Sequence, residues 1–137
     1  MTLIDLQLPD EQAARLDRFA SSVRKSRGEA TAQLIEEALR HEEFPAVEFR
    51  DSILGRQAYV VGSTLAVWEV LMVAQSYALD AEKTAAHLGW HSGRARDTLR
   101  YAAAFPEEIQ AALEENRSMT EDGLRAMLPA ARWLETK

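Results

Sequence analysis

The chain has 137 residues, a net charge of −6 and no cysteine. The lack of cysteine excludes disulfides, thiolate metal sites and a cysteine nucleophile. The acidic balance argues against general affinity for nucleic acid, so any DNA binding must come from local patches. No apolar run is long enough to span a bilayer, and no charged segment precedes an apolar one, which predicts a cytoplasmic protein without a membrane partner.

The first residues predict one short strand, over 3–8, that ends at Pro9. Alternation places Ile4, Leu6 and Leu8 on one of its faces. A lone strand cannot satisfy its own backbone donors and acceptors, so we expect it to pair with the same strand of a second copy. The sequence therefore predicts a homodimer held by an intermolecular ribbon.

Two amphipathic helices are expected to follow this strand. Asp10 is the expected N-cap of the first, whose apolar stripe is Leu16, Phe19 and Val23. Residues 25–28 interrupt the pattern, and a second helix carries Ala30, Leu34, Ile35, Ala38 and Leu39. Residues 1–44 thus resemble the ribbon-helix-helix family, whose members are dimeric readers of the major groove.

This resemblance implies that different parts of the module contact different parts of the DNA. The polar face of the ribbon would meet the bases, and the start of the second helix would hold phosphate. Carried over to this chain, the base-facing residues are Leu3, Asp5 and Gln7, and the backbone-facing residues are Ser26 and Arg27. The ribbon is acidic and lacks arginine, so base reading stays open. The alternative is an ordinary strand and helical hairpin packed inside a larger fold.

A second module, residues 45–117, is expected after Pro45. Two β-favouring runs, 47–50 and 57–61, predict a small hairpin with a loop over 51–56. A buried helix with Trp68 follows, then a helix capped by Asp80 and ended by Gly89, and then a third helix. The last two helices with the glycine turn between them predict a helix-turn-helix, winged-helix-like domain, and the chain as a whole is expected to be mainly α.

Several turn and helix residues of this module carry a second resemblance. They are Gly55-Arg56, Gly62-Ser63-Thr64 with Val67, Leu99-Arg100-Tyr101-Ala102 and Phe105-Pro106. In order and spacing, over about residues 47–115, they resemble the bacterial domain-of-unknown-function 433 family. That family comprises predicted antitoxin components, and a ribbon-helix-helix module followed by this domain is the combination expected of antitoxins.

The third helix is the locally basic element of the module. Arg94, Arg96 and Arg100 fall outside its inward face of Ala95, Leu99 and Ala102. We interpret these arginines as candidate DNA contacts. An equally open interpretation is a solvated surface helix with an Arg94–Asp97 pair.

Residues 118–137 are interpreted as an acidic interaction tail. Thr120 is expected to cap a helix that stops at Pro129, with 130–134 extended. The apolar set that would contact a toxin is Leu124, Met127, Leu128 and Trp133. The alternative is a tail folded back onto its own chain.

No motif supports an enzyme, a cofactor or a metal site. The three histidines lie in no metal-ligand spacing, and Gly89 separates His87 from His91. There is no phosphate loop and no nucleophile elbow. Trp68 and Trp90 are interpreted as core residues.

Together these features predict a dimeric antitoxin of a type II toxin-antitoxin pair. It would neutralise a toxin by direct contact and repress its own operon by binding operator DNA. The resemblance implies a PIN-like ribonuclease as the toxin. The alternatives are a stand-alone dimeric transcriptional regulator without a toxin and a purely structural dimerisation module.

Overall fold

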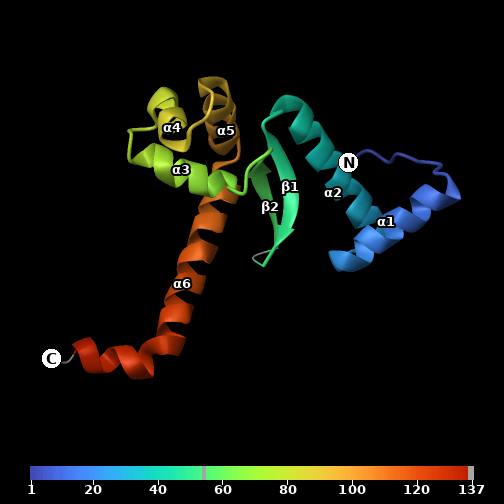
Figure 1. The fold of residues 1–137 in the computed structure, drawn as a ribbon. Coiled ribbons are helices and arrows are strands. Elements are labelled where there is room, and N and C mark those ends of the chain that lie inside the picture. Colours follow the sequence, from blue (N-terminus) through green and yellow to red (C-terminus); the bar gives the residue numbers. More distant parts are fainter. Residues whose placement is uncertain (54, 136–137) are drawn as a thin grey trace. The chain divides into compact units, whose positions relative to one another are not determined.

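The computed structural model describes residues 1–53 and 55–135, and it describes their side chains as far as Gly123 and at Arg125. It is mainly helical with one small antiparallel hairpin among the described residues (Figure 1). The elements are α1 (Asp10–Ser22), α2 (Arg27–Glu43), β1 (Val47–Ser52), β2 (Gly55–Val60), α3 (Val67–Gln75), α4 (Ala81–Leu88), α5 (Ser92–Ala104) and α6 (Pro106–Glu135). The chain divides into two units, Met1–Glu42 and Glu43–Lys137.

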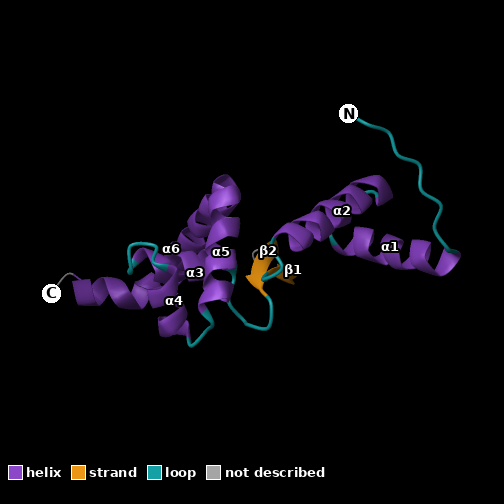
Figure 2. Cartoon of the chain, turned by 90° about the horizontal axis from the view of Figure 1, so that it is seen from above, coloured by secondary structure: helices purple, strands orange, loops and turns teal. Residues whose placement is uncertain are grey.

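The first unit contains the expected helical pair, α1 and α2 (Figure 2). The expected cap is wrong by one residue: Pro9, whose ring holds it at φ −54°, is the N-cap of α1, and Asp10 is already helical. At the other end of α1, the amide of Lys25 donates to the carbonyl of Ala20 at 2.9 Å, and Arg24 is left-handed with φ 57°. This Schellman-type ending turns the chain into α2.

The segment before α1, residues 1–9, forms no strand within the described residues of this single chain. A ribbon needs a neighbouring strand to supply its hydrogen bonds. The intermolecular ribbon therefore stays a prediction about two chains.

In the second unit, β1 and β2 form the predicted hairpin. Val47 lies opposite Val60, and Ser52 lies opposite Gly55. The strands reach further toward the turn than the predicted loop over 51–56 allowed. Gly55 has a φ of 98°, a conformation open to glycine without strain, and this lets β2 begin directly after a two-residue connection.

The three helices after the hairpin begin and end near the predicted signals. The side chain of Asp80 caps α4 by accepting from the amide of Lys83 at 2.9 Å. Gly89 is left-handed with φ 71°, and the amide of Trp90 donates back to the carbonyl of Ala85 at 2.8 Å. The helix, glycine turn and helix that the sequence predicts are therefore present as α4 and α5. The winged-helix arrangement stays a prediction.

The core of the second unit joins the hairpin to α3, α5 and α6. Its buried members are Phe44, Val47, Ala58, Val60, Val67, Val70, Tyr101, Ala102 and Ile109. Tyr101 is fully buried, and its ring centroid lies 5.4 Å from that of Phe44 and 4.8 Å from that of Phe105. Trp68 and Trp90 pack against this core, as the sequence predicts.

The last helix corrects the expectations for the carboxyl-terminal segment. α6 continues through 118–120 and through Pro129, so the expected interruption, the stop and the extended run at 130–134 are wrong. Thr120 does not cap a new helix, because its hydroxyl donates to the carbonyl of Asn116 one turn earlier, at 2.9 Å.

Only the start of α6 belongs to the core. Ile109 is buried and Leu113 packs beside it, whereas the described residues from Arg117 to Gly123 are all exposed. None of the helices in the described part of the chain is long and apolar enough to cross a membrane.

Candidate nucleic-acid and partner interfaces

The predicted phosphate site at the start of α2 is closed by the chain itself. The amide of Glu29 donates to Oγ of Ser26, and the amide of Ser26 donates to a carboxylate oxygen of Glu29, each at 3.2 Å. This is a capping box. It occupies two of the amide groups expected to hold phosphate and adds a negative charge at the helix start. A phosphate would have to displace Glu29 to bind here.

Arg27 is also engaged within the first unit. It donates from Nε and Nη2 to the two carboxylate oxygens of Asp17, at 2.9 and 2.8 Å. The hydrogen bond from Arg27 lowers the pKa of Asp17, and the same bond raises the pKa of Arg27. Hydrogen bonds from Ser26 lower the pKa of Glu29. Ser26 and Arg27 are thus brought together at one helix start, each with an acidic partner.

The predicted ribbon residues Leu3, Asp5 and Gln7 are exposed. So is the apolar face that alternates with them, since Ile4 is 70% exposed and Leu6 is 56% exposed. The side chains of both faces are therefore accessible in the single chain.

The fully buried residues of the first unit are all small, and the predicted apolar stripe of α1, Leu16, Phe19 and Val23, is only partly buried. The buried residues are Ala20 and Ala30, two small side chains, while Ile35 and Leu39 on α2 are about half exposed. Burying a large aliphatic side chain contributes about 1.5–3 kcal/mol, and two alanines supply far less than a helical pair needs. Several large apolar side chains of the first unit therefore stay exposed in the single chain.

Arg94, a predicted DNA contact, is a packing residue of the second unit. Its guanidinium lies over the ring of Trp90, 4.4 Å from the centroid, and donates to the carbonyl of Val61. The left-handed Gly62, φ 74°, leaves room for it, since a Cβ there would lie 3.3 Å from a guanidinium nitrogen. Arg94 therefore ties α5 to the end of the hairpin.

Arg96 and Arg100 lie one turn apart on α5 and are both exposed. Arg100 donates to Asp97 at 2.7 Å and lies over the ring of Phe44. Asp97 also accepts from the amide of Ala46 at 2.8 Å. The Arg94–Asp97 pair considered from the sequence is wrong, because Asp97 pairs with Arg100. Arg96 faces Glu82 of α4 across 3.6 Å.

The predicted toxin contacts Leu124, Met127, Leu128 and Trp133 lie in the helical backbone of α6, but their side chains are outside the described residues. Met119, just over one turn before Leu124, is about half exposed.

Sequence reasoning missed the acidic partners of the predicted DNA-contacting residues. Ser26-Arg27-Gly28-Glu29 carries the spacing of a capping box and gave a usable signal for Glu29. The spacing of Asp97, three residues before Arg100 on the predicted helix, gave a weaker signal for that pair. Glu82 meets Arg96 only through the packing of α4 on α5, for which the sequence holds no local signal.

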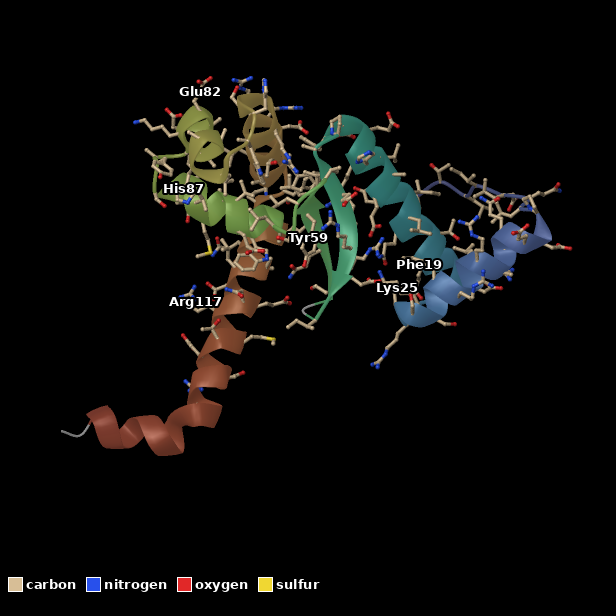
Figure 3. All side chains as sticks on the ribbon, in the orientation of Figure 1. Phe19, Lys25, Tyr59, Glu82, His87 and Arg117 are labelled. Carbon is tan, nitrogen blue, oxygen red and sulfur yellow. The ribbon has the colours of Figure 1, made fainter. Side chains whose placement is uncertain are left out.

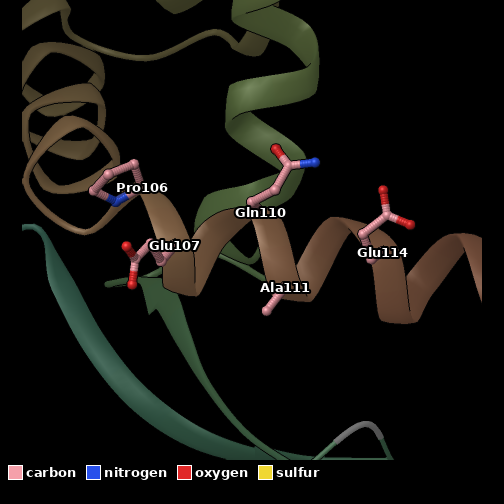
Figure 4. Close-up of a pocket in the computed structure, with 5 residues that line it drawn as sticks. All are labelled: Pro106, Glu107, Gln110, Ala111 and Glu114. Carbon is pink, nitrogen blue, oxygen red and sulfur yellow. The ribbon is translucent and has the colours of Figure 1, made fainter.

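Two further surface features lie in the second unit. An open hollow runs along one face of α6 and is lined by Pro106, Glu107, Gln110, Ala111 and Glu114 (Figure 4). Nδ1 of His87 lies 2.8 Å from the hydroxyl of Tyr77 at the surface of the second unit (Figure 3). Among the described residues, no three His, Asp or Glu side chains are grouped closely enough to hold a metal ion.

Comparison of the chain with family models gave no match, and searches of curated proteins and of solved structures gave none. The resemblances to the ribbon-helix-helix and domain-of-unknown-function 433 families therefore stay predictions from the sequence motifs.

Arg94→Gln is expected to destabilise the protein by about 1 kcal/mol, because it removes the stacking on Trp90 and a charged donor to Val61. Arg94→Lys should restore little of this, since an ammonium group does not stack as a planar guanidinium does. Arg96→Gln is the matched control and should be nearly neutral. Thermal unfolding followed by circular dichroism measures all three. Equal melting temperatures for Arg94→Gln and the wild type would contradict the packing role.

Acid should weaken the first unit through Asp17 and Glu29. Both carboxyls have a lowered pKa in the folded chain. Their stabilising contribution is therefore present above the unfolded pKa, about 4, and is lost as pH falls through the lower folded values. The melting temperature of Asp17→Asn should lie slightly below that of the wild type at neutral pH. The two melting temperatures should converge as the pH falls below the lowered pKa of Asp17 in the folded chain. Glu115→Gln on α6 controls for the loss of one negative charge. A difference in melting temperature between Asp17→Asn and the wild type that grows on acidification would contradict the expectation.

Proposed function

We propose that the protein is a dimeric antitoxin of a type II toxin-antitoxin pair, which binds its toxin directly and represses its own operon through operator DNA. The observation that carries the proposal is the exposed apolar surface of the first unit, made by Leu3, Ile4, Leu6, Leu8, Ile35 and Leu39. So many large apolar side chains exposed on one small unit are typical of a protein interface. A second copy covers them most simply, since strand 3–8 would then gain its missing backbone partners.

Operator binding is assigned to α5, the second helix of the helix-turn-helix element. Residues 45–105 carry six basic and six acidic groups, so this stretch has no net charge that would attract DNA generally. Binding must rest on single guanidinium–phosphate contacts repeated in two copies of the chain. The first unit contributes the dimer, and its own cations Lys25 and Arg27 are engaged with Gln33 and Asp17.

Toxin binding is assigned to the outer half of α6. After Leu113 this helix leaves the core, and its described residues from Arg117 to Gly123 are exposed. Glu121 and Asp122 are among them and would oppose a basic, RNA-cleaving surface. A helical stretch exposed like residues 117–123 would gain stability from a partner, because isolated helices are marginal in water. The partner class follows from the resemblance and is a PIN-like ribonuclease.

Leu6→Pro is expected to abolish dimerisation, because proline removes a backbone donor from the ribbon. Leu6→Val is the matched control, since a β-branched residue favours the strand and keeps the donor. Sedimentation velocity at micromolar concentration compares the two variants with the wild type. A wild type that sediments as a monomer would make the ribbon-helix-helix prediction wrong.

Deletion of residues 118–137 is expected to leave the dimer intact while it abolishes copurification with the product of the neighbouring gene. If Trp133 anchors the complex, Trp133→Ala alone should weaken binding roughly thirty-fold, about 2 kcal/mol. A melting curve on the deletion variant separates this from a tail that packs on its own chain, which would lower the melting temperature. Retained protection from the toxin in the deletion variant would sink the tail assignment. A neighbouring gene without a ribonuclease-like product would favour the stand-alone regulator.

A further inference from the structure

The three arginines of α5 differ in how firmly their guanidinium groups are held. Arg94 is fixed against Trp90 and the hairpin, as described above. Arg100 is paired at 2.7 Å with Asp97, whose side chain is only 15% exposed and is itself fixed by the amide of Ala46. Arg96 has the loosest arrangement, with its nitrogen 3.6 Å from a carboxylate oxygen of Glu82 and both side chains more than half exposed.

The Arg96–Glu82 pair contributes little to folding. Exposed ion pairs are worth about 0–1 kcal/mol, because water screens them and two long side chains lose freedom. Arg96 can therefore move away from Glu82 at little cost in free energy. If Arg100 moved away from Asp97, that nearly buried carboxylate would lose one of its hydrogen-bond donors. Figure 3 shows Glu82 on α4 with its side chain directed away from the ribbon.

We propose that Arg96 is the phosphate-contacting arginine of α5 and that Glu82 is its intramolecular competitor, which lowers the affinity of the protein for DNA. The inference rests on the proposed operator binding and deepens it. In the free protein, the Glu82 carboxylate lies beside the Arg96 guanidinium, in the place that a phosphate oxygen would take. In the complex the Glu82 carboxylate lies near the negatively charged backbone and opposes binding a second time. Glu82 thus limits affinity without being needed for the fold.

The test uses the full-length protein and two duplexes, one spanning the promoter of its own gene and one of mixed sequence, titrated at several salt concentrations. Glu82→Gln should bind both duplexes about five-fold more tightly at low salt, because the competing charge is gone. Arg96→Gln should weaken binding and reduce the slope of log affinity against log salt by about 0.9 for each phosphate that is no longer neutralised. The gain from Glu82→Gln should disappear when Arg96→Gln is also present.

Two further variants separate this from simpler effects. Glu107→Gln removes another exposed carboxylate from the first turn of a helix in the same unit, so it controls for net charge and helix dipole. Glu82→Asp keeps the charge in the first turn of α4 but shortens its reach toward Arg96, and it should bind more tightly than the wild type.

The outcomes distinguish the inference from the proposed function. Wild-type binding with a normal salt slope, unchanged in Glu82→Gln, overturns the inference and leaves operator binding standing. A gain that persists in the Arg96→Gln background also overturns it, because Glu82 would then act by general repulsion. Failure of both the wild type and Glu82→Gln to bind either duplex overturns operator binding together with the inference.

Discussion

The buried ring of Tyr101 is the contact on which the second unit depends. It touches the ring of Phe44 before β1, the ring of Phe49 within β1 and the ring of Phe105 at the end of α5. Its hydroxyl donates to Glu108 on α6. Aromatic side chains of this size bury about 150–250 Å² each, and their edge-to-face contacts add about 0.5–1.5 kcal/mol. The residue before β1, β1 itself and α6 are thereby all fixed to α5, and these contacts set the orientation of its exposed face.

The first unit lacks any such centre among its described residues. Ala20 and Ala30 cannot hold two helices together, and its main tertiary polar contact, Arg27 with Asp17, is exposed. Its folding is therefore expected to be linked to association, so that stability and protomer concentration are inseparable. This asymmetry gives each unit a different physical task. Under the proposed function, the first unit would complete its core by pairing, and the second unit would present α5 from the core that it already has.

Local signals in the sequence predicted much of this fold. Asp80 and Gly89 mark the two ends of α4 because capping is decided by a residue and its nearest neighbours. Pro106 likewise begins a helix directly after Phe105, at the position where proline costs nothing. The same reasoning was wrong at Thr120 and Pro129. Thr120 returns its hydroxyl to the preceding turn, and the long helical stretch on either side of Pro129 continues through it.

The candidate site was less predictable, because a charge in a sequence says nothing of its partner. Arg94, Arg96 and Arg100 look alike at helical spacing, yet one is packed, one is held by a fixed carboxylate and one is loosely paired. The difference comes from Val61, Ala46 and Glu82, which lie outside α5. Contacts between residues far apart in the chain produce no periodicity or motif in the amino-acid sequence.

If α5 binds DNA as proposed, its one loosely paired arginine, Arg96, limits the affinity. One phosphate contact changes affinity only modestly, and residues 45–105 carry equal numbers of basic and acidic groups. Two copies joined through the first unit present two such helices at once, and the second contact then forms at a high effective concentration. Operator binding and dimerisation are linked in this scheme. Under the proposed function, loss of the ribbon would weaken DNA binding although no residue of the ribbon touched DNA. Loss of Arg96 would also weaken it, but the dimer would persist. In this proposal the first unit contributes to DNA recognition mainly through the dimer interface, and less through the side chains of the acidic ribbon.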